Sequence, residues 1–283
     1  MPKLAFVIFV VAILQFLSCQ KPETIPVENL SGNVVGILGH GGRGQHFMVP
    51  QNSLASVKKA LTYEGVGFEI DVQLTQNNAI AVFHDKYLDG STKCEGMVRN
   101  FTTNAIIDCE YSSSALSRLR ATHNISMLEK ILHYATKSEP KPQISLDVKL
   151  YADSSEDRQT YIETFAKRLV ETVEAVYPVN KVFIECPNAE FLKTVQELNP
   201  DLRLFAYQDF EQALRTAVEN GFYGITLAHK KTNSDQVKLA HSKNIRVMLF
   251  GIGSTSSVRA AISYSPDYIQ VENIPNALNV QYE

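Results

Sequence analysis

The stretch that decides the fold reads FEIDVQLT at residues 68–75 and AIAVFHD at residues 79–85. Alternate side chains of a β-strand lie on the same face, so Glu69 and Asp71 point the same way. Two carboxylates that converge in this manner are typical of a site for a hard cation. The first run therefore predicts a strand that carries part of a metal site.

The residues between the two runs predict a tight turn. Asn77 and Asn78 tolerate left-handed backbone, so a two-residue turn would fold the second run antiparallel onto the first. Pairing Gln76 with Ala79 then sets Asp71 opposite His84. An imidazole on the same face as both acids is an arrangement for proton transfer beside a metal ion.

Length and charge exclude some classes of protein. A chain of 283 residues with 45% hydrophobic content can bury a full core, as one barrel or as two domains. Its formal net charge is −3, which argues against nucleic acid binding driven by overall charge. No protein partner is inferred.

The first residues predict export. Lys3 is followed by an apolar run to Leu17, which is shorter than the ~20 residues of a membrane span and is typical of a signal peptide over residues 1–18. The ending FLSC at residues 16–19 resembles a bacterial lipobox, with Phe16 where Leu is more usual. We therefore expect lipidation of Cys19, a tether over residues 19–32, and a lipid-anchored protein of the bacterial cell envelope, periplasmic or at the cell surface. Plain secretion and an uncleaved anchor are the alternatives.

Three cysteines remain in the mature chain. In an oxidising compartment Cys94 and Cys109 could close a small loop, the alternative being that both are reduced. Cys186 ends an apolar run and is expected to be a buried thiol.

Apolar runs alternate with helical patterns along residues 33–283, as in a parallel sheet with crossover helices. Helices are expected at residues 52–64 and 127–135 and around an apolar stripe at 161–173, and residues 86–125 form an insertion. Strands are expected at residues 34–38, 68–73, 144–149, 181–186, 203–207, 224–228, 246–250 and 268–272. Eight such units predict an α/β protein of the TIM-barrel class, provided the arm that ends in His84 is a loop extension and not a barrel strand.

Barrels of this class carry their active sites at the carboxyl ends of the strands. The candidate residues of the first three strands fall at or near those ends and are expected to share one mouth: His40, Glu69, Asp71, Asp147 and Lys149.

Several motifs, taken together, resemble the glycerophosphodiester phosphodiesterase family. They are GHGGRG at residues 39–44, PQNS at 50–53, EIDVQLT at 69–75, HD at 84–85 and DVK at 147–149. The resemblance implies that Glu69, Asp71 and Asp147 hold a divalent cation. It also implies that His40 and His84 act as general base and general acid.

The chemistry of the residues agrees with this resemblance. Carboxylate oxygens without cysteine favour one Ca²⁺ or Mg²⁺ ion over zinc. Arg43 and Lys149 are suited to hold phosphate oxygens. Departures from the family pattern concern the phosphate and head-group contacts: Gly41-Gly42 precede Arg43, Gln51 stands for a glutamate, Asp147 for a glutamate and Phe250 for a tryptophan.

The resemblance implies hydrolysis of a glycerophosphodiester to glycerol 3-phosphate and an alcohol. Two alternatives remain open. One is cleavage of a lysophospholipid or sphingolipid in the manner of phospholipase D, and the other is a surface lipoprotein that binds phospho-ligands without turnover.

Overall fold

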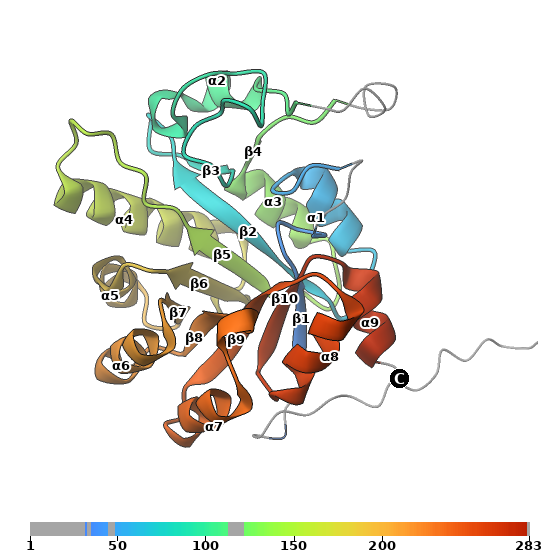
Figure 1. Cartoon of the computed structure of the whole chain (residues 1–283). Coiled ribbons are helices and arrows are strands. Elements are labelled where there is room, and N and C mark those ends of the chain that lie inside the picture. Colours follow the sequence, from blue (N-terminus) through green and yellow to red (C-terminus); the bar gives the residue numbers. More distant parts are fainter. Residues whose placement is uncertain (1–31, 33–34, 45–48, 113–121, 282–283) are drawn as a thin grey trace, which may run out of the picture.

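The computed structural model describes residue 32 and residues 35–44, 49–112 and 122–281 (Figure 1). The expected signal peptide, Cys19 and all of the expected tether except Gly32 lie outside these residues. Within them, no helix is both long and apolar enough to cross a membrane.

Eight parallel strands form a closed barrel, which confirms the predicted TIM-barrel class (Figure 1). β1 pairs with both β10 and β2, and this double pairing closes the sheet. The strands are β1 (Gly36–Gly39), β2 (Gly67–Leu74), β5 (Ile144–Val148), β6 (Val182–Cys186), β7 (Arg203–Tyr207), β8 (Gly224–Ala228), β9 (Arg246–Ile252) and β10 (Tyr268–Val271).

Helices connect the strands and cover the outside of the barrel (Figure 1). Several begin at a side chain that accepts a backbone N–H, such as Ser53 before α1 and Asp209 before α6. The helices are α1 (Leu54–Ala60), α3 (Leu128–Ala135), α4 (Arg158–Val176), α5 (Ala189–Leu198), α6 (Phe210–Asn220), α7 (Ser234–Ser242), α8 (Thr255–Ser263) and α9 (Ile274–Gln281). Short 3₁₀ turns lie at Val179–Lys181 and His229–Lys231.

The arm that ends near His84 is a loop extension outside the barrel. β3 (Ile80–Val82) pairs antiparallel with β2 on one side and with β4 (Ser126–Met127) on the other. The predicted register is wrong by one residue, because Leu74 pairs with Ile80 and the Phe83 N–H donates to the Asp71 carbonyl at 3.0 Å. Asp71 is therefore opposite Phe83, not His84.

The turn explains this difference. Thr75 N–H donates to the Ala79 carbonyl at 2.9 Å, so the loop contains Gln76, Asn77 and Asn78 instead of two residues. Asn78 has a φ of 59°. Three-residue hairpin loops place their last residue in this left-handed region, and one residue more in the loop moves every later side chain to the opposite face.

The insertion between β3 and β4 has a small apolar core of its own, which includes Leu88, Val98 and Ile106. It contains a 3₁₀ turn at Val98–Asn100 and the short helix α2 (Thr103–Ile107). A disulfide links Cys94 to Cys109, and Cys186 is a buried free thiol.

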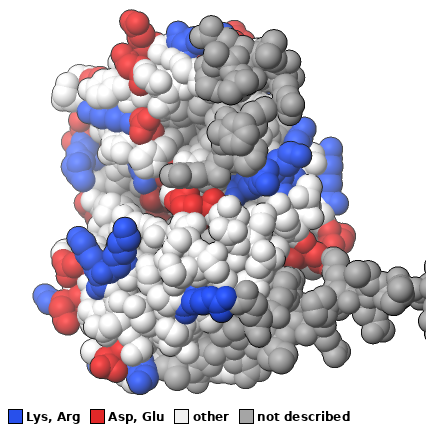
Figure 2. All heavy atoms as spheres, turned by 45° about the vertical axis from the view of Figure 1, so that its right-hand side comes forward, with Lys and Arg blue, Asp and Glu red and all other residues white. Residues whose placement is uncertain are grey.

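Aromatic side chains fill the barrel at the end where its strands begin. The ring of Phe183 lies 5.0 Å from that of Phe205 and 4.7 Å from that of Tyr268, centre to centre. This packing closes the amino end of the barrel, so polar side chains gather at the carboxyl end. On the face shown in Figure 2, basic and acidic side chains are interspersed over the surface, in keeping with the small net charge of −3.

Candidate active site

The three predicted metal ligands meet at the mouth of the barrel. Glu69 and Asp71 lie on one face of β2, and the pairing of β2 with β5 sets Asp147 beside Asp71. One oxygen from each of the three carboxylates lies within 4.8 Å of the other two. All three come from rigid strands, so the cluster is held in place before any ligand arrives.

The protein balances the charges of this cluster only in part, through Lys149 and His40. Burial, and then the neighbouring Asp71, raise the pKa of Glu69 well above its ordinary value. Burial also raises the pKa of Asp147, although Lys149 acts in the opposite direction. Glu69 Oε1 and Asp147 Oδ1 are buried without a hydrogen-bond partner. Unpaired buried oxygens in a cluster of three carboxylates fit a hard divalent cation such as Ca²⁺ or Mg²⁺.

Asn52 holds Asp71 in position, a role that the sequence did not reveal. Its Nδ2 donates to Asp71 Oδ2 at 2.7 Å, and its Oδ1 accepts the Asp71 N–H at 2.9 Å. The Asn52 backbone has a φ of 58°, which asparagine tolerates better than most residues. The motif PQNS at residues 50–53, one of those that carry the family resemblance, was the available signal, but the sequence did not connect Asn52 with Asp71.

His40 follows β1 and lies beside the acids. Its Nδ1 is 2.7 Å from Glu272 Oε1, and its Nε2 is 3.8 Å from Glu69 Oε2. Burial disfavours a charged imidazole, but Glu69 and Glu272 outweigh that effect and raise the pKa of His40 to about 10. Gln51 donates to the other oxygen of Glu272 at 3.2 Å. An acid at position 51, as in the usual family motif, would instead repel Glu272.

His84 lies in a bend after β3, and its side chain is 58% exposed. Its Nδ1 is 2.8 Å from Asp85 Oδ1, and Ser91 donates to Asp85 Oδ2 at 2.8 Å. The charge of His84 acts to lower the pKa of Asp147, which places the ring within electrostatic range of the acid cluster. Each histidine thus has its Nδ1 beside a carboxylate, which directs Nε2 toward other partners.

The two predicted phosphate-binding residues differ in position. Lys149 Nζ lies 3.0 Å from Asp71 Oδ1 and 2.8 Å from Asp147 Oδ2, and these acids raise its pKa against the effect of burial. The Arg43 N–H donates to Ser56 Oγ of α1 at 2.8 Å, and its Nη2 donates to the Tyr63 hydroxyl, in the turn after α1, at 3.5 Å. Lys149 is therefore at the acid cluster, whereas the Arg43 guanidinium contacts Tyr63, and its phosphate role stays a prediction.

A second polar layer lies beneath the acids, inside the barrel. Glu185 accepts hydrogen bonds from Gln270, at 2.6 Å, and from Ser145. Burial, and then the charge of Asp147, raise the pKa of Glu185 to about 7. The sequence placed Glu185 near a strand end without assigning it a role.

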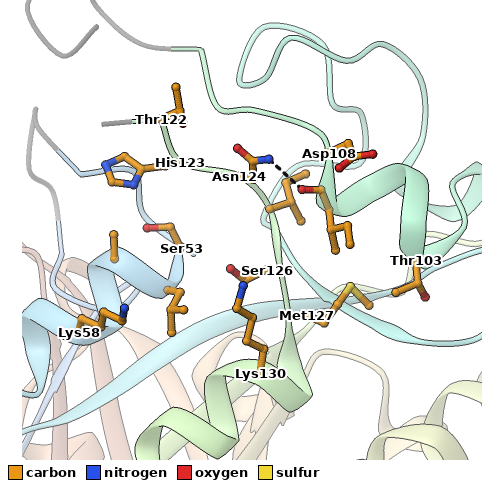
Figure 3. Close-up of a pocket in the computed structure, with 14 residues that line it drawn as sticks. Ser53, Lys58, Thr103, Asp108, Thr122, His123, Asn124, Ser126, Met127 and Lys130 are labelled. Carbon is orange, nitrogen blue, oxygen red and sulfur yellow. Dashed lines mark hydrogen bonds between the residues drawn. The ribbon is translucent and has the colours of Figure 1, made fainter. Parts of the chain in front are cut away.

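A cavity of about 650 Å³ lies elsewhere, on the outside of the barrel wall. Figure 3 shows it between α1, α3 and the insertion, with Lys58, His123 and Lys130 among its lining side chains. None of the three acids, nor His40 or His84, lines this cavity. The candidate active site is therefore the polar mouth of the barrel and not this cavity.

Comparisons with known proteins agree with this fold. A family model described as "Glycerophosphoryl diester phosphodiesterase family" matches residues 40–274. A "Glycerophosphodiester phosphodiesterase" of Bacillus altitudinis is 22% identical over 85% of this chain and 96% of its own length. One of the same description from Caldanaerobacter subterraneus is 41% identical, but over only 23% of this chain and 26% of that relative.

Solved structures show the same fold at low sequence identity. A putative glycerophosphoryl diester phosphodiesterase from Silicibacter pomeroyi has a TM-score of 0.78 at 16% identity, over 90% of this chain and 95% of its own. An Oleispira antarctica phosphodiesterase, in complex with the product sn-glycerol-3-phosphate, has a TM-score of 0.74 at 17% identity, over 87% and 96%.

The barrel and the extent of the family match define the class of protein: this chain is a phosphoric diester hydrolase built on a TIM barrel. More narrowly, because the family model covers most of its length, the chain belongs to the glycerophosphoryl diester phosphodiesterase family.

Proposed function

We propose that this enzyme hydrolyses glycerophosphodiesters to glycerol 3-phosphate and an alcohol, and that it requires Ca²⁺ or Mg²⁺. The observation that carries the proposal is the group of three carboxylates at the mouth, of which Glu69 and Asp71 are buried and Asp147 is 14% exposed. Glu69 and Asp147 each have a buried oxygen without a hydrogen-bond partner. Such a group is costly in a protein that does not bind a cation, because ionised buried carboxylates lose their hydration.

A phosphodiester is an anion that resists attack by a nucleophile, so three functions have to be supplied. The cation held by Glu69, Asp71 and Asp147 would withdraw charge from the phosphate oxygens. Lys149 adds a fixed positive charge beside these acids, within reach of the same phosphate. A base must then take a proton from the attacking hydroxyl, and an acid must give one to the leaving alkoxide.

His40 and His84 are the residues proposed for this base and acid. Each ring is held through Nδ1 by a carboxylate, Glu272 for His40 and Asp85 for His84. We propose that Nε2 of each ring acts on the substrate, with that of His40 on the side of the acids, 3.8 Å from Glu69 Oε2. A protein that only binds phospho-ligands has no need of two imidazoles oriented in this way.

The alcohol part of the substrate is proposed to rest on aromatic side chains at the mouth. The rings of Tyr207 and Phe250 pack edge to face with centres 5.2 Å apart, and both line a cavity of about 510 Å³ beside the ends of β7 and β8. Burial raises the pKa of Tyr207, and the charge of Asp147 acts in the same direction, so Tyr207 is near the acids.

The deciding experiment measures glycerol 3-phosphate release from glycerophosphocholine by the purified protein with Ca²⁺ or Mg²⁺. We expect turnover that EDTA abolishes and that either added cation restores. Lysophosphatidylcholine serves as the comparison substrate. Release of lysophosphatidic acid or cyclic phosphatidic acid without glycerol 3-phosphate would favour phospholipase D-like cleavage. Binding without turnover would favour the non-catalytic alternative, and activity unchanged by EDTA would exclude the cation.

We also propose that the protein is exported and anchored by a lipid on Cys19. The N-terminal pattern of residues 1–19 supports this, and the Cys94–Cys109 disulfide suits an oxidising compartment.

A further inference from the structure

Two segments of the insertion form a small clamp, which we define as residues 91–94 paired with residues 109–112. Ser112 N–H donates to the Ser91 carbonyl at 2.9 Å, and Lys93 N–H donates to the Glu110 carbonyl at 2.8 Å. Between these contacts Thr92 and Tyr111 form an antiparallel bridge. The Cys94–Cys109 disulfide closes one end of the clamp covalently.

The open end of the clamp reaches the histidine side of the active site through Ser91. Its hydroxyl donates to Asp85 Oδ2 at 2.8 Å, while the other oxygen of Asp85 is 2.8 Å from His84 Nδ1. The backbone of Asp85 is also held by β2, because Gln73 Nε2 donates to the Asp85 carbonyl at 2.8 Å. Ser91 therefore acts on the orientation of His84 through Asp85.

The same end reaches the acid cluster through Tyr111. The Tyr111 hydroxyl, which is buried, donates to the Asn52 carbonyl at 3.1 Å. Asn52 in turn makes the two hydrogen bonds that hold Asp71. The ring of Tyr111 packs against Phe83 with centres 6.0 Å apart, next to His84 in the chain.

We propose that the clamp is a positioning element of the active site, in which Tyr111 sets Asp71 through Asn52, Ser91 sets His84 through Asp85, and the disulfide keeps the two contacts in register. Tyr111 and Ser91 are positioning residues, because among the described residues their hydroxyl groups donate to Asn52 and Asp85 and not to the three acids, His40 or His84. The inference rests on the proposed function for its catalytic consequence, but its structural consequence is measurable without substrate.

Tyr111→Phe is the sharpest test, because it removes one oxygen atom and keeps the ring. We expect the affinity for Ca²⁺ or Mg²⁺ in calorimetry to fall about tenfold, as when residues that orient metal ligands are lost. In the cation-free protein, hydrogen exchange of the Asp71 amide should become faster, because Asn52 Oδ1 is its acceptor.

Tyr177→Phe is the matched control. Tyr177 is also a buried tyrosine whose hydroxyl donates to a backbone carbonyl, that of Pro142 at 2.9 Å, before β5 begins. The two variants should lose similar thermal stability. Only Tyr111→Phe should change cation affinity and Asp71 exchange, which separates positioning from general destabilisation.

A double variant, Cys94→Ser with Cys109→Ser, tests the disulfide. Like Tyr111→Phe, it should make hydrogen exchange of the Asp71 amide faster. It should also lower kcat more than it raises KM, because the acids and histidines remain but are less well placed.

The outcomes for the clamp and for the proposed function are separate. Unchanged Asp71 exchange in both Tyr111→Phe and the double cysteine variant would overturn the clamp proposal, whether or not the enzyme is active. Absence of glycerophosphodiester hydrolysis by the unaltered protein would overturn the proposed function, and the exchange measurement would still decide the role of the clamp.

Discussion

At the scale of single residues, Glu69 illustrates a conflict between stability and function. It is buried beside Asp71. The groups that offset its negative charge are the Gly41 N–H, 2.8 Å from Oε2, and His40 Nε2, 3.8 Å from the same oxygen. We predict that Glu69→Gln raises the Tm of the cation-free protein, by about 2–4 °C for each 1 kcal/mol of charge repulsion removed. The same variant should bind Ca²⁺ or Mg²⁺ more than about 100-fold more weakly, since even residues that only orient ligands cost 10–100-fold.

The pH dependence of this effect has a definite sign. A carboxyl whose pKa is raised by folding binds its proton more tightly in the folded state, so stability falls as pH rises from 4.5 through that raised pKa. Cation-free wild type should show this loss in thermal melts, and Glu69→Gln should show less of it. Glu219→Gln, at an exposed position of α6, is the control and should change neither quantity. A lower Tm for Glu69→Gln at neutral pH would contradict the prediction.

His84 offers a second prediction at this scale. Because its side chain is 58% exposed, removal should leave the fold intact, yet loss of a general acid or base costs about 10²–10⁴-fold in kcat. We expect His84→Ala to lower kcat by that amount with an unchanged Tm. His133→Ala removes a histidine of 62% exposure from α3 and should leave kcat unchanged. Near-native turnover by His84→Ala would contradict the proposed role of His84 as a general acid or base.

The acids could be predicted because strand alternation is a property of neighbouring residues: it placed Glu69 and Asp71 on one face, and the third strand supplied Asp147. The residues that orient these acids and His40 could not be predicted from the sequence. Asn52 is 19 positions from Asp71, and Glu272 is far from His40 in the chain. Such contacts depend on how loops meet at the mouth, and no local pattern encodes that geometry.

At the scale of elements, the hairpin of β2 and β3 shows where pattern reasoning fails. The two strands and their direction were predicted correctly, but the register was not, because Asn77-Asn78 suits a two-residue turn while the chain forms a three-residue one. A side chain from outside the hairpin contacts this turn. Arg99 of the insertion donates to Asn78 Oδ1 at 3.0 Å and to the Thr75 carbonyl.

Arg99 therefore ties the hairpin tip to the rest of the molecule. Its Nε lies 3.0 Å from Glu156 before α4, and its side chain is only 12% exposed. We predict that Arg99→Ala lowers the free energy of unfolding by about 2 kcal/mol, since it removes partly buried hydrogen bonds to a charged group. Urea denaturation provides the measurement.

The matched control for Arg99 is Arg168→Ala. Arg168 also contacts the hairpin tip, through the Asn78 carbonyl at 3.1 Å, but its side chain is 49% exposed. Exposed pairs contribute about 0–1 kcal/mol, so this variant should remain close to wild type. Equal losses in the two variants would show that burial of Arg99 is not the reason for its effect.

At the scale of the whole molecule, the direction of the strands relates the mouth to the rest of the chain. The count of eight parallel strands was predictable because each strand and helix unit has its own local pattern. All eight run toward the mouth, and the first begins at Gly36, so the chain enters the barrel at the end opposite to the acids. A lipid anchor on Cys19 would thus reach the barrel from the end opposite to its active site.

This geometry leads to a prediction about substrate. If the proposed anchor on Cys19 holds the barrel with its mouth away from the membrane, the enzyme should favour water-soluble glycerophosphodiesters over lysophospholipids embedded in a bilayer. We expect kcat/KM for glycerophosphocholine to be the same for the lipidated protein on vesicles and for a soluble protein produced without residues 1–19, since the chain enters the barrel at the end opposite to the acids. Lysophosphatidylcholine in vesicles should be cleaved more slowly than glycerophosphocholine by both forms. Faster cleavage of the embedded lipid by the lipidated form than by the soluble form would mean that the tether lets the mouth turn toward the bilayer.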